Sequence, residues 1–347
     1  MNFNASDAHV SHRLHLNESD SNNLSMFRQQ FCDEFDKIST YPDPGNTELV
    51  SAVSQHYQTS NEKIVLGNGV DELILLLCLT LLKNNKTIIT SESTFPGYET
   101  AARVCGGNVI HAELSDDLRC STENFVKYVD KDTAVAFLCN PHNPTGHIMS
   151  TGEVMSFIQK MNELNVIPVI DEAYIHFSDE DRYSVLNYVA HGGKAIVLRT
   201  FSKAYGLAGL RVGFAIGPEQ IIKDIQNTAL ALPFRINRFA QKMVPLVLSN
   251  NAFLQENILK TERLIKNIQV QFLAQEIKFI PSSTNFICFK PRQSSKPFAE
   301  IAAAAGAMVR DCGLFGLPGW VRASISSQQD ADLLLTLTGA HDNNLNR

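Results

Sequence analysis

Short apolar runs alternate with amphipathic runs along the first two thirds of the chain, and this alternation limits the possible folds more than any other feature. Six runs are rich in Val, Ile and Phe, as strands are: Lys86–Ser91, Asn108–Leu114, Ala134–Cys139, Val166–Ile170, Ala195–Leu198 and Arg211–Ile216. Amphipathic runs typical of helices include Asn46–Tyr57, Asp71–Leu82 and Glu153–Asn165. Strands that are apolar on both faces must be covered on both sides. The pattern therefore predicts an α/β fold, a mostly parallel sheet with helices on both faces.

The pattern changes after Pro233, where a smaller α+β domain is expected. Residues Asn237–Gln275 are typical of one long helix or two joined helices. Two strands, each followed by a helix, are expected at Phe286–Phe289 and Val321–Ser326. A chain of 347 residues is long enough for two domains. We expect a large domain over residues 41–235 and a small one over 236–347. Residues 1–40 have no obvious place in the sheet and are predicted to pack on the small domain or on a partner subunit.

Composition argues against several classes of protein. The chain has 30 Lys and Arg residues against 36 Asp and Glu, so its net charge of −6 offers no basic excess for nucleic acid. The longest apolar run, Leu73–Leu82, is about half the ~20 residues that a membrane-spanning helix needs. Seven widely spaced cysteines without a C-x-x-C pair fit neither a disulfide framework nor a zinc site. The polar N-terminus does not resemble a signal peptide, so we expect a cytoplasmic protein that binds no metal, membrane or nucleic acid.

Unusual polar and glycine-rich segments fall where strands are expected to end or begin. Active sites of parallel α/β sheets lie beyond the carboxyl ends of the strands. The segments are Leu66–Glu72, Cys139–Gly146, Asp171–Tyr174, Thr200–Lys203 and Gly209–Arg211. Each one alone has an ordinary structural explanation, such as a tight turn, a loop, a helix N-cap or a solvated lysine. Together they indicate a single site.

These segments contain the groups that pyridoxal phosphate requires. Glycines before a helix N-terminus offer backbone N–H groups to an anion, to which a nearby Ser hydroxyl and Arg guanidinium can add. Lys203 can bond covalently to a carbonyl cofactor, and Asp171 can keep a pyridine nitrogen protonated. Asn143 and Tyr174 can hydrogen-bond an oxygen on the same ring. The combination predicts a pyridoxal phosphate site.

The order of motifs resembles that of the fold-type-I, class I/II aminotransferases. The motifs are GNGVDE (67–72), STFPGY (93–98), NPHNPTG (140–146), DEAY (171–174), FSKAYGLAGLRVG (201–213) and VRASI (321–325). The similarity runs from about Tyr41 to Leu334, and within the family the chain looks most like the histidinol-phosphate aminotransferases. It implies a mostly parallel seven-stranded sheet, pyridoxal 5'-phosphate as cofactor, and a homodimer whose active sites are shared between subunits.

The resemblance also implies a role for individual residues. Those implied in catalysis are Lys203 as the lysine that bonds to the cofactor, Asp171 beside the ring nitrogen and Tyr174 beside the ring hydroxyl. Further implied cofactor contacts are Gly69, Val70, Ser202 and Arg211 on the phosphate, Phe95 on the ring face, Asn143 on the ring hydroxyl and Tyr41 on the phosphate of the neighbouring subunit. Those implied in substrate binding are Arg322, Arg310 and Asn143. Arg310 has an alternative, an ion pair with Asp311 or Glu300.

Three departures from the family pattern lie on the substrate side. Asn17–Asp20 lacks the proline that follows Asn-Glu in the family, and the segment before Asn17 lacks the aromatic residue that covers the substrate phosphate in the nearest relatives. Arg235 stands where a small or polar residue is commoner, either as a solvated side chain or as one that alters the pocket.

The expected reaction is transamination between L-histidinol phosphate, as amino donor, and 2-oxoglutarate, as keto-acid acceptor, which yields imidazole acetol phosphate and L-glutamate. Three alternatives stay open. One is an aminotransferase for an aromatic or another amino acid, such as a basic one. Another is a lyase or decarboxylase of the threonine-phosphate decarboxylase type or an arginine-modifying enzyme, because pyridoxal phosphate supports several reactions on one fold. The third is a binding or regulatory protein that keeps the fold without catalysis.

Overall fold

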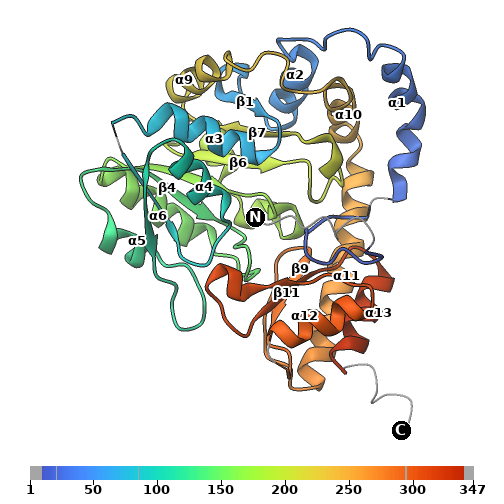
Figure 1. Ribbon diagram of the computed structural model, residues 1–347. Helices are drawn as coiled ribbons and strands as arrows, with labels where there is room; N and C mark the ends of the chain where they lie inside the picture. The colour runs from blue at the N-terminus through green and yellow to red at the C-terminus, as the bar shows by residue number, and fades with distance from the viewer. Residues whose placement is uncertain (1–9, 21, 85, 294, 340–347) are drawn as a thin grey trace.

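The computed structural model describes residues 10–20, 22–84, 86–293 and 295–339, and its larger sheet has seven strands in the order β1-β7-β6-β5-β4-β2-β3 (Figure 1). The strands are β1 (Ile64–Gly67), β2 (Thr87–Ser91), β3 (Asn108–Ala112), β4 (Thr133–Cys139), β5 (Ile167–Asp171), β6 (Ile196–Thr200) and β7 (Gly213–Ile216). Strands β2 to β6 are parallel to one another, whereas β7 is antiparallel to both β6 and β1. The predicted α/β fold with a mostly parallel sheet is confirmed.

Helices cover both faces of this sheet, which explains why strands such as β4 and β6 carry buried apolar residues on both faces. On β6, Ile196 and Leu198 belong to one buried cluster and Val197 to the other. The first cluster is completed by α3 (Val70–Leu81), α4 (Gly97–Val104) and α9 (Glu219–Ala229). The second contains residues of α2 (Thr47–His56), α5 (Thr122–Tyr128), α6 (Thr151–Glu163), α8 (Leu186–Ala190) and α10 (Arg238–Leu248).

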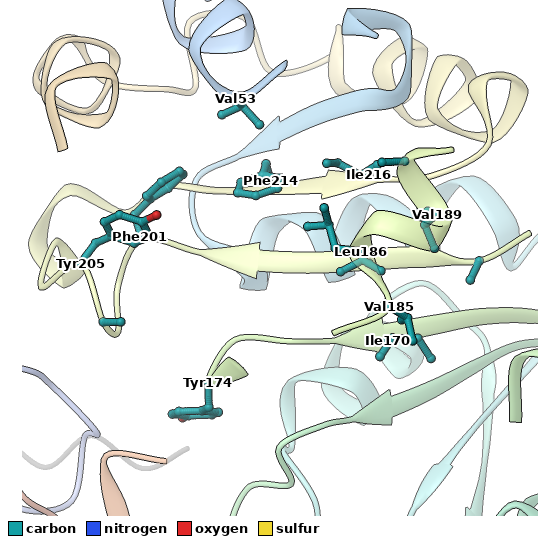
Figure 2. Packing of buried hydrophobic residues seen from close by; sticks show 14 of the residues in the cluster. Val53, Ile170, Tyr174, Val185, Leu186, Val189, Phe201, Tyr205, Phe214 and Ile216 are labelled. Atoms are coloured by element: carbon teal, nitrogen blue, oxygen red, sulfur yellow. The ribbon is translucent and has the colours of Figure 1, made fainter. Parts of the chain in front are cut away.

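The second cluster continues beyond the carboxyl ends of β5 and β6 (Figure 2). Tyr174 follows β5, and Phe201 and Tyr205 follow β6; all three lie beyond the same end of the sheet in Figure 2. The rings of Phe201 and Tyr205 lie 5.0 Å apart between centroids. The loops that carry the predicted site residues are therefore anchored by aromatic packing.

A smaller antiparallel sheet follows in the C-terminal part of the chain, with strand order β10-β11-β9-β8. Its strands are β8 (Phe279–Ile280), β9 (Phe286–Phe289), β10 (Arg310–Asp311) and β11 (Val321–Ser324). Residues of α11 (Asn251–Ala274), α12 (Ser295–Ala304) and α13 (Gln328–Leu337) share a buried cluster with β9 and β11. The strands predicted at Phe286–Phe289 and Val321–Ser326 are present, and the expected smaller α+β unit is confirmed.

Three local expectations are refined. The helical stretch Asn237–Gln275 forms two helices, α10 and α11, and the Asn250 side chain caps the second by accepting the N–H of Phe253. The strand expected from Arg211 begins only at Gly213, because Arg211 has a left-handed backbone (φ 50°) at the end of a short 3-10 helix. The sequence patterns did not predict β1, of four residues, or β8 and β10, which have two residues each and so too little length for a periodic pattern.

The N-terminal segment contacts both parts of the structure. Leu14 is buried in the cluster of the small sheet, and its carbonyl oxygen accepts the N–H of Ser324 on β11 at 2.7 Å. Further along, α1 (Arg28–Phe35) packs on α10, where the rings of Phe31 and Phe239 stack at 4.3 Å. The division of the chain at residues 40 and 235 stays a prediction. Among the described residues, no helix is long and apolar enough to cross a membrane.

Candidate active site

Two adjoining cavities, of about 340 and 430 Å³, lie beyond the carboxyl ends of β4, β5 and β6. Four residues line both of them: Phe95, Asn143, Tyr174 and Lys203. The first is completed by Val70, Asp71, Cys139, Asp171, Ala173, Thr200, Ser202 and Arg211. The second is completed by His15, Leu16, Asn17, Pro96, Arg310, Leu314, Phe315 and Arg322. The fold thus brings residues from the large sheet, the small sheet and the N-terminal segment to one place.

A turn between β1 and α3 meets Arg211 at one end of the first cavity. Gly69 has a left-handed backbone (φ 81°), and a Cβ on it would lie 2.3 Å from Arg211 Nη2, so a side chain there would displace the guanidinium. Arg211 Nη1 donates to Ser202 Oγ at 3.3 Å, and Nη2 pairs with Asp71 at 2.9 Å. Val70 begins α3, whose N-terminus attracts anions. These groups form a cradle for a phosphate.

Asp171 ends β5 and is only 4% exposed. Its Oδ2 accepts a hydrogen bond of 2.6 Å from the Tyr98 hydroxyl, and Oδ1 accepts the N–H of Ala173 at 3.0 Å. Burial raises the pKa of Asp171 to about 6, despite both hydrogen bonds. A carboxylate in this setting gains from a cationic partner, such as a protonated ring nitrogen.

Lys203 lies between the two cavities, where its Nζ donates to the carbonyl oxygen of Asn17 at 3.0 Å. Burial, followed by the positive charge of Arg322, lowers the pKa of Lys203 to about 8. A minor fraction of the amine, about a tenth at pH 7, is therefore neutral. That form is the nucleophile and the proton acceptor.

Tyr174 and Asn143 lie where the two cavities meet. The Tyr174 hydroxyl accepts a hydrogen bond of 2.9 Å from Asn17 Nδ2, and burial raises the pKa of Tyr174, so its phenol stays protonated. Asn143 Oδ1 accepts from Arg322 Nη1 at 2.5 Å. Asn143 thus connects the place where the cavities meet to Arg322.

Arg310 and Arg322 are direct cross-strand neighbours in the small sheet, since they are paired residues of the adjacent antiparallel strands β10 and β11. Both line the second cavity. Arg322 Nη2 donates to the His15 carbonyl oxygen at 2.6 Å, while its buried Nε has no hydrogen-bond partner in the part of the chain that the structure describes. No carboxylate among the described residues pairs with Arg310, so the alternative ion pair with Asp311 or Glu300 is absent there. Two guanidiniums are therefore available to an anionic ligand.

Three residues discussed from the sequence line neither cavity: Gly69, in the turn described above, Tyr41 and Arg235. Tyr41 is 78% exposed, and its ring stacks on Phe234 at 4.4 Å. Arg235 is not a solvated side chain, and that interpretation is wrong: it is largely buried and pairs with Glu72 at 3.1 Å. It also does not line the cavities, so it does not reshape them directly.

The structure adds contacts that the sequence patterns did not assign. Tyr98 belongs to the STFPGY motif, but its contact with Asp171 joins positions 73 apart in the chain. Asn17 belongs to the N-terminal segment and contacts both Tyr174 and Lys203. The only sequence signal for either residue was its place in a family motif.

The residues of the first cavity fit pyridoxal phosphate. The glycine turn and Arg211 leave no room for a Cβ and suit a phosphate, the buried carboxylate of Asp171 suits a ring nitrogen that carries a proton, and the Lys203 amine suits a carbonyl. Phe95 lines the same cavity and can cover a ring face.

Comparison with known proteins decides the family. A model of the aminotransferases of class I and II matches residues 14–336. The chain belongs to this family. Curated relatives of this aminotransferase include histidinol-phosphate aminotransferase 2 of Carboxydothermus hydrogenoformans, 32% identical over 84% of this chain and 80% of the relative. The enzyme of the same name from Methylococcus capsulatus is 33% identical over 84% of this chain and 80% of its own length.

Solved structures agree with this aminotransferase in fold. The histidinol-phosphate aminotransferase of Sinorhizobium meliloti, solved with pyridoxal-5'-phosphate, superposes with a TM-score of 0.85 at 24% identity and covers 95% of this chain and 90% of its own. The aromatic aminotransferase of Pyrococcus horikoshii gives 0.83 at 21% identity and covers 94% of each chain. The fold is therefore shared by enzymes named for different substrates.

Proposed function

We propose that this aminotransferase uses pyridoxal 5'-phosphate to transfer the amino group of L-histidinol phosphate to 2-oxoglutarate. The products are imidazole acetol phosphate and L-glutamate. The observation that carries the proposal is the position of Arg310 and Arg322 opposite each other in a cavity that also contains Lys203. The names of the curated relatives support the same substrate.

The cofactor is held by the residues of the first cavity. Val70, Ser202 and Arg211, with Gly69 in the turn beside them, would bind its phosphate, Phe95 would cover one ring face, and Asn143 and Tyr174 would bind the ring hydroxyl. The ring supplies an electron sink for the negative charge that develops at the α-carbon of the substrate. Asp171 keeps the ring nitrogen protonated, and the Tyr98 hydroxyl orients the Asp171 carboxylate.

Lys203 moves the proton. With the cofactor and substrate bound, the free Lys203 Nζ would be the group that takes the proton from the substrate α-carbon and returns it on the cofactor side. The lowered pKa of Lys203 keeps this amine neutral in part of the molecules at neutral pH, as a base requires. The carbonyl oxygen of Asn17 orients Nζ.

The two arginines explain how one site takes two different substrates in turn. A guanidinium binds carboxylate or phosphate with two parallel hydrogen bonds. Arg322, already fixed by Asn143 and the His15 carbonyl, binds the phosphate of histidinol phosphate or a carboxylate of the keto acid. Arg310 adds a second positive charge at the same end of the cavity.

We further propose a cytoplasmic homodimer. Tyr41 is exposed and lies outside the cavities of its own protomer, as expected of a residue that reaches the cofactor phosphate of the neighbouring subunit. All seven cysteines are unpaired, which is usual in a reducing compartment.

Steady-state kinetics with a panel of amino donors and 2-oxoglutarate test the substrate. We expect kcat/KM for L-histidinol phosphate to exceed that for L-phenylalanine and L-arginine by at least about tenfold, or ~1.4 kcal/mol in transition-state binding. A tenfold preference for either amino acid would contradict the substrate while leaving transamination intact. Release of carbon dioxide from threonine phosphate, without amino transfer, would replace the aminotransferase by the decarboxylase alternative.

A further inference from the structure

Arg235 lies outside both cavities but contacts the turn at the phosphate end of the first one. Its side chain is 17% exposed, and its Nε lies 3.1 Å from the carboxylate of Glu72 in the first turn of α3. Its Nη2 donates a hydrogen bond of 2.6 Å to the carbonyl oxygen of Leu66 on β1. One guanidinium therefore ties the end of β1 to the start of α3.

Glu72 passes this contact on to the backbone of the turn. Its Oε2 accepts a hydrogen bond of 2.6 Å from the N–H of Asn68, which lies between Gly67 and Gly69. Gly69 in turn packs against Arg211, with no room for a Cβ between them. The turn is thus held by Arg211 at Gly69 and by the Arg235–Glu72 pair at Asn68.

Charge balance gives Arg235 a second effect. Asp71 and Glu72 both lie in the first turn of α3, the end of a helix that attracts anions. Asp71 pairs with Arg211, and Glu72 pairs with Arg235. Without Arg235, the negative charge of Glu72 would stand uncompensated next to the phosphate cradle and would repel a phosphate.

We propose that Arg235 is a positioning residue for the phosphate of the cofactor. It fixes the turn through Leu66 and Glu72, and it neutralises Glu72. This inference rests on the proposed function, which assigns Gly69 and Arg211 to the cofactor phosphate. It follows that Arg235 strengthens binding of pyridoxal phosphate but not of pyridoxal, the same ring without a phosphate.

Gln226, on α9, provides a matched control because it bonds to the same strand. β1 lies at the edge of the sheet, and two of its carbonyl oxygens accept hydrogen bonds from side chains. Gln226 Nε2 donates to Ile64 at 2.8 Å, as Arg235 does to Leu66. Gln226→Met therefore removes one such bond from β1 without changing Glu72 or the turn.

The experiment measures the dissociation constants of pyridoxal phosphate and pyridoxal for the apoenzyme by equilibrium dialysis. For Arg235→Met we expect that of pyridoxal phosphate to rise about tenfold and that of pyridoxal to stay within about twofold. Arg235→Lys, which keeps the charge, should stay within about threefold of wild type, and Arg235→Met/Glu72→Gln, which removes both charges but also the bond to Leu66, should recover only part of the loss. Gln226→Met should change neither constant.

Unchanged affinity for pyridoxal phosphate in Arg235→Met, or an equal loss for both ligands, would overturn the inference. So would a loss in Gln226→Met as large as that in Arg235→Met. A wild-type apoenzyme that binds neither ligand would contradict the proposed function instead, so the two failures are distinguishable. If Arg235→Met does not fold, Arg235→Gln, which also removes the charge, takes its place with the same expected result.

Discussion

At the scale of single residues, burial shifts two pKa values in the directions that the proposed reaction needs. It lowers the pKa of Lys203 to about 8 and raises that of Asp171 to about 6. Both shifts arise because a charge is disfavoured away from water. The amine becomes a better base, and the carboxylate becomes a group that gains from a cationic partner.

Lys203→Ala should reduce transamination by at least ~10³-fold, because no other group takes over both the covalent bond and the proton transfer. Contacts at Gly69, Ser202 and Arg211 should still retain the cofactor. Turnover is measured as glutamate formed, and the visible spectrum reports loss of the lysine-bound cofactor. Lys160→Ala, a surface lysine paired with Glu163, is the control. Wild-type turnover in Lys203→Ala would rule out its assigned role.

Asp171→Asn should lower kcat more than about a hundredfold, or ~2.7 kcal/mol, because an amide does not keep the ring nitrogen protonated and the electron sink weakens. The rate is measured with saturating cofactor, so that weaker binding does not imitate a slower step. A rate within about threefold of wild type would show that Asp171 does not act on the ring.

The same substitution should stabilise the apoenzyme at neutral pH. The pKa of Asp171 rises from 3.8 in the unfolded chain to about 6 in the folded one, so between these values the folded state binds more protons. Stability therefore falls as pH rises from about 4 to 6, and at pH 7 the ionised carboxylate costs up to about 3 kcal/mol. The free energy of unfolding of apo Asp171→Asn, measured with denaturant, should lack this pH dependence. A variant that is less stable than wild type at pH 7 would contradict the prediction.

At the scale of elements, the pairing of β10 with β11 sets the substrate end of the site. Arg310 and Arg322 come from adjacent strands, and the antiparallel register places them side by side. Strand β10 has two residues only, so its position depends on its neighbour β11. The pairing of β10 with β11 therefore sets the distance between the two guanidinium groups.

Arg310→Ala should reduce kcat/KM for L-histidinol phosphate by about thirtyfold to a hundredfold, which corresponds to the loss of one charge-assisted contact to a phosphate. The reduction of kcat/KM for L-glutamate should be smaller. Arg322 remains to bind the single carboxylate. The comparison needs both half-reactions measured on one preparation, with Arg292→Ala, on the surface of the small sheet's domain, as the control. Equal losses for both substrates would argue that Arg310 does not discriminate between them.

At the scale of the whole molecule, the proposed site requires two protomers. Tyr41 stacks on Phe234 at the surface of its own protomer and reaches neither cavity there. An aromatic residue left exposed to this degree is suited to an interface.

Complementation tests this sharing. Tyr41→Ala and Lys203→Ala should each be inactive or nearly so, but a mixed dimer holds one site with both defects and one with neither. An equal mixture after subunit exchange should recover up to about a quarter of wild-type activity, since half of the dimers are mixed and each has one intact site. Exchange is verified by tagged subunits. No recovery in verified mixed dimers would place Tyr41 outside the shared site.

The sequence by itself determined the features that depend on short stretches of chain. Alternation of apolar and amphipathic runs predicted the parallel sheet and its two helical layers, because burial on both faces acts on each strand separately. Motifs such as Thr200–Lys203 and Asp171–Tyr174 could be assigned to strand ends for the same reason. Strands β8 and β10, of two residues each, escaped prediction because a period cannot be recognised in so few positions, and the four-residue strand β1 was also missed.

The tertiary structure alone decided which side chains meet. Tyr98 reaches Asp171 because α4 and β5 lie near each other in the folded chain, and Arg310 opposes Arg322 because of strand register. The sequence allowed two positions for Arg235, in solvent or in the pocket. In the structure Arg235 instead pairs with Glu72, which lies 163 positions earlier in the chain. Charge and polarity are local properties of a residue, whereas its partner depends on how distant segments pack.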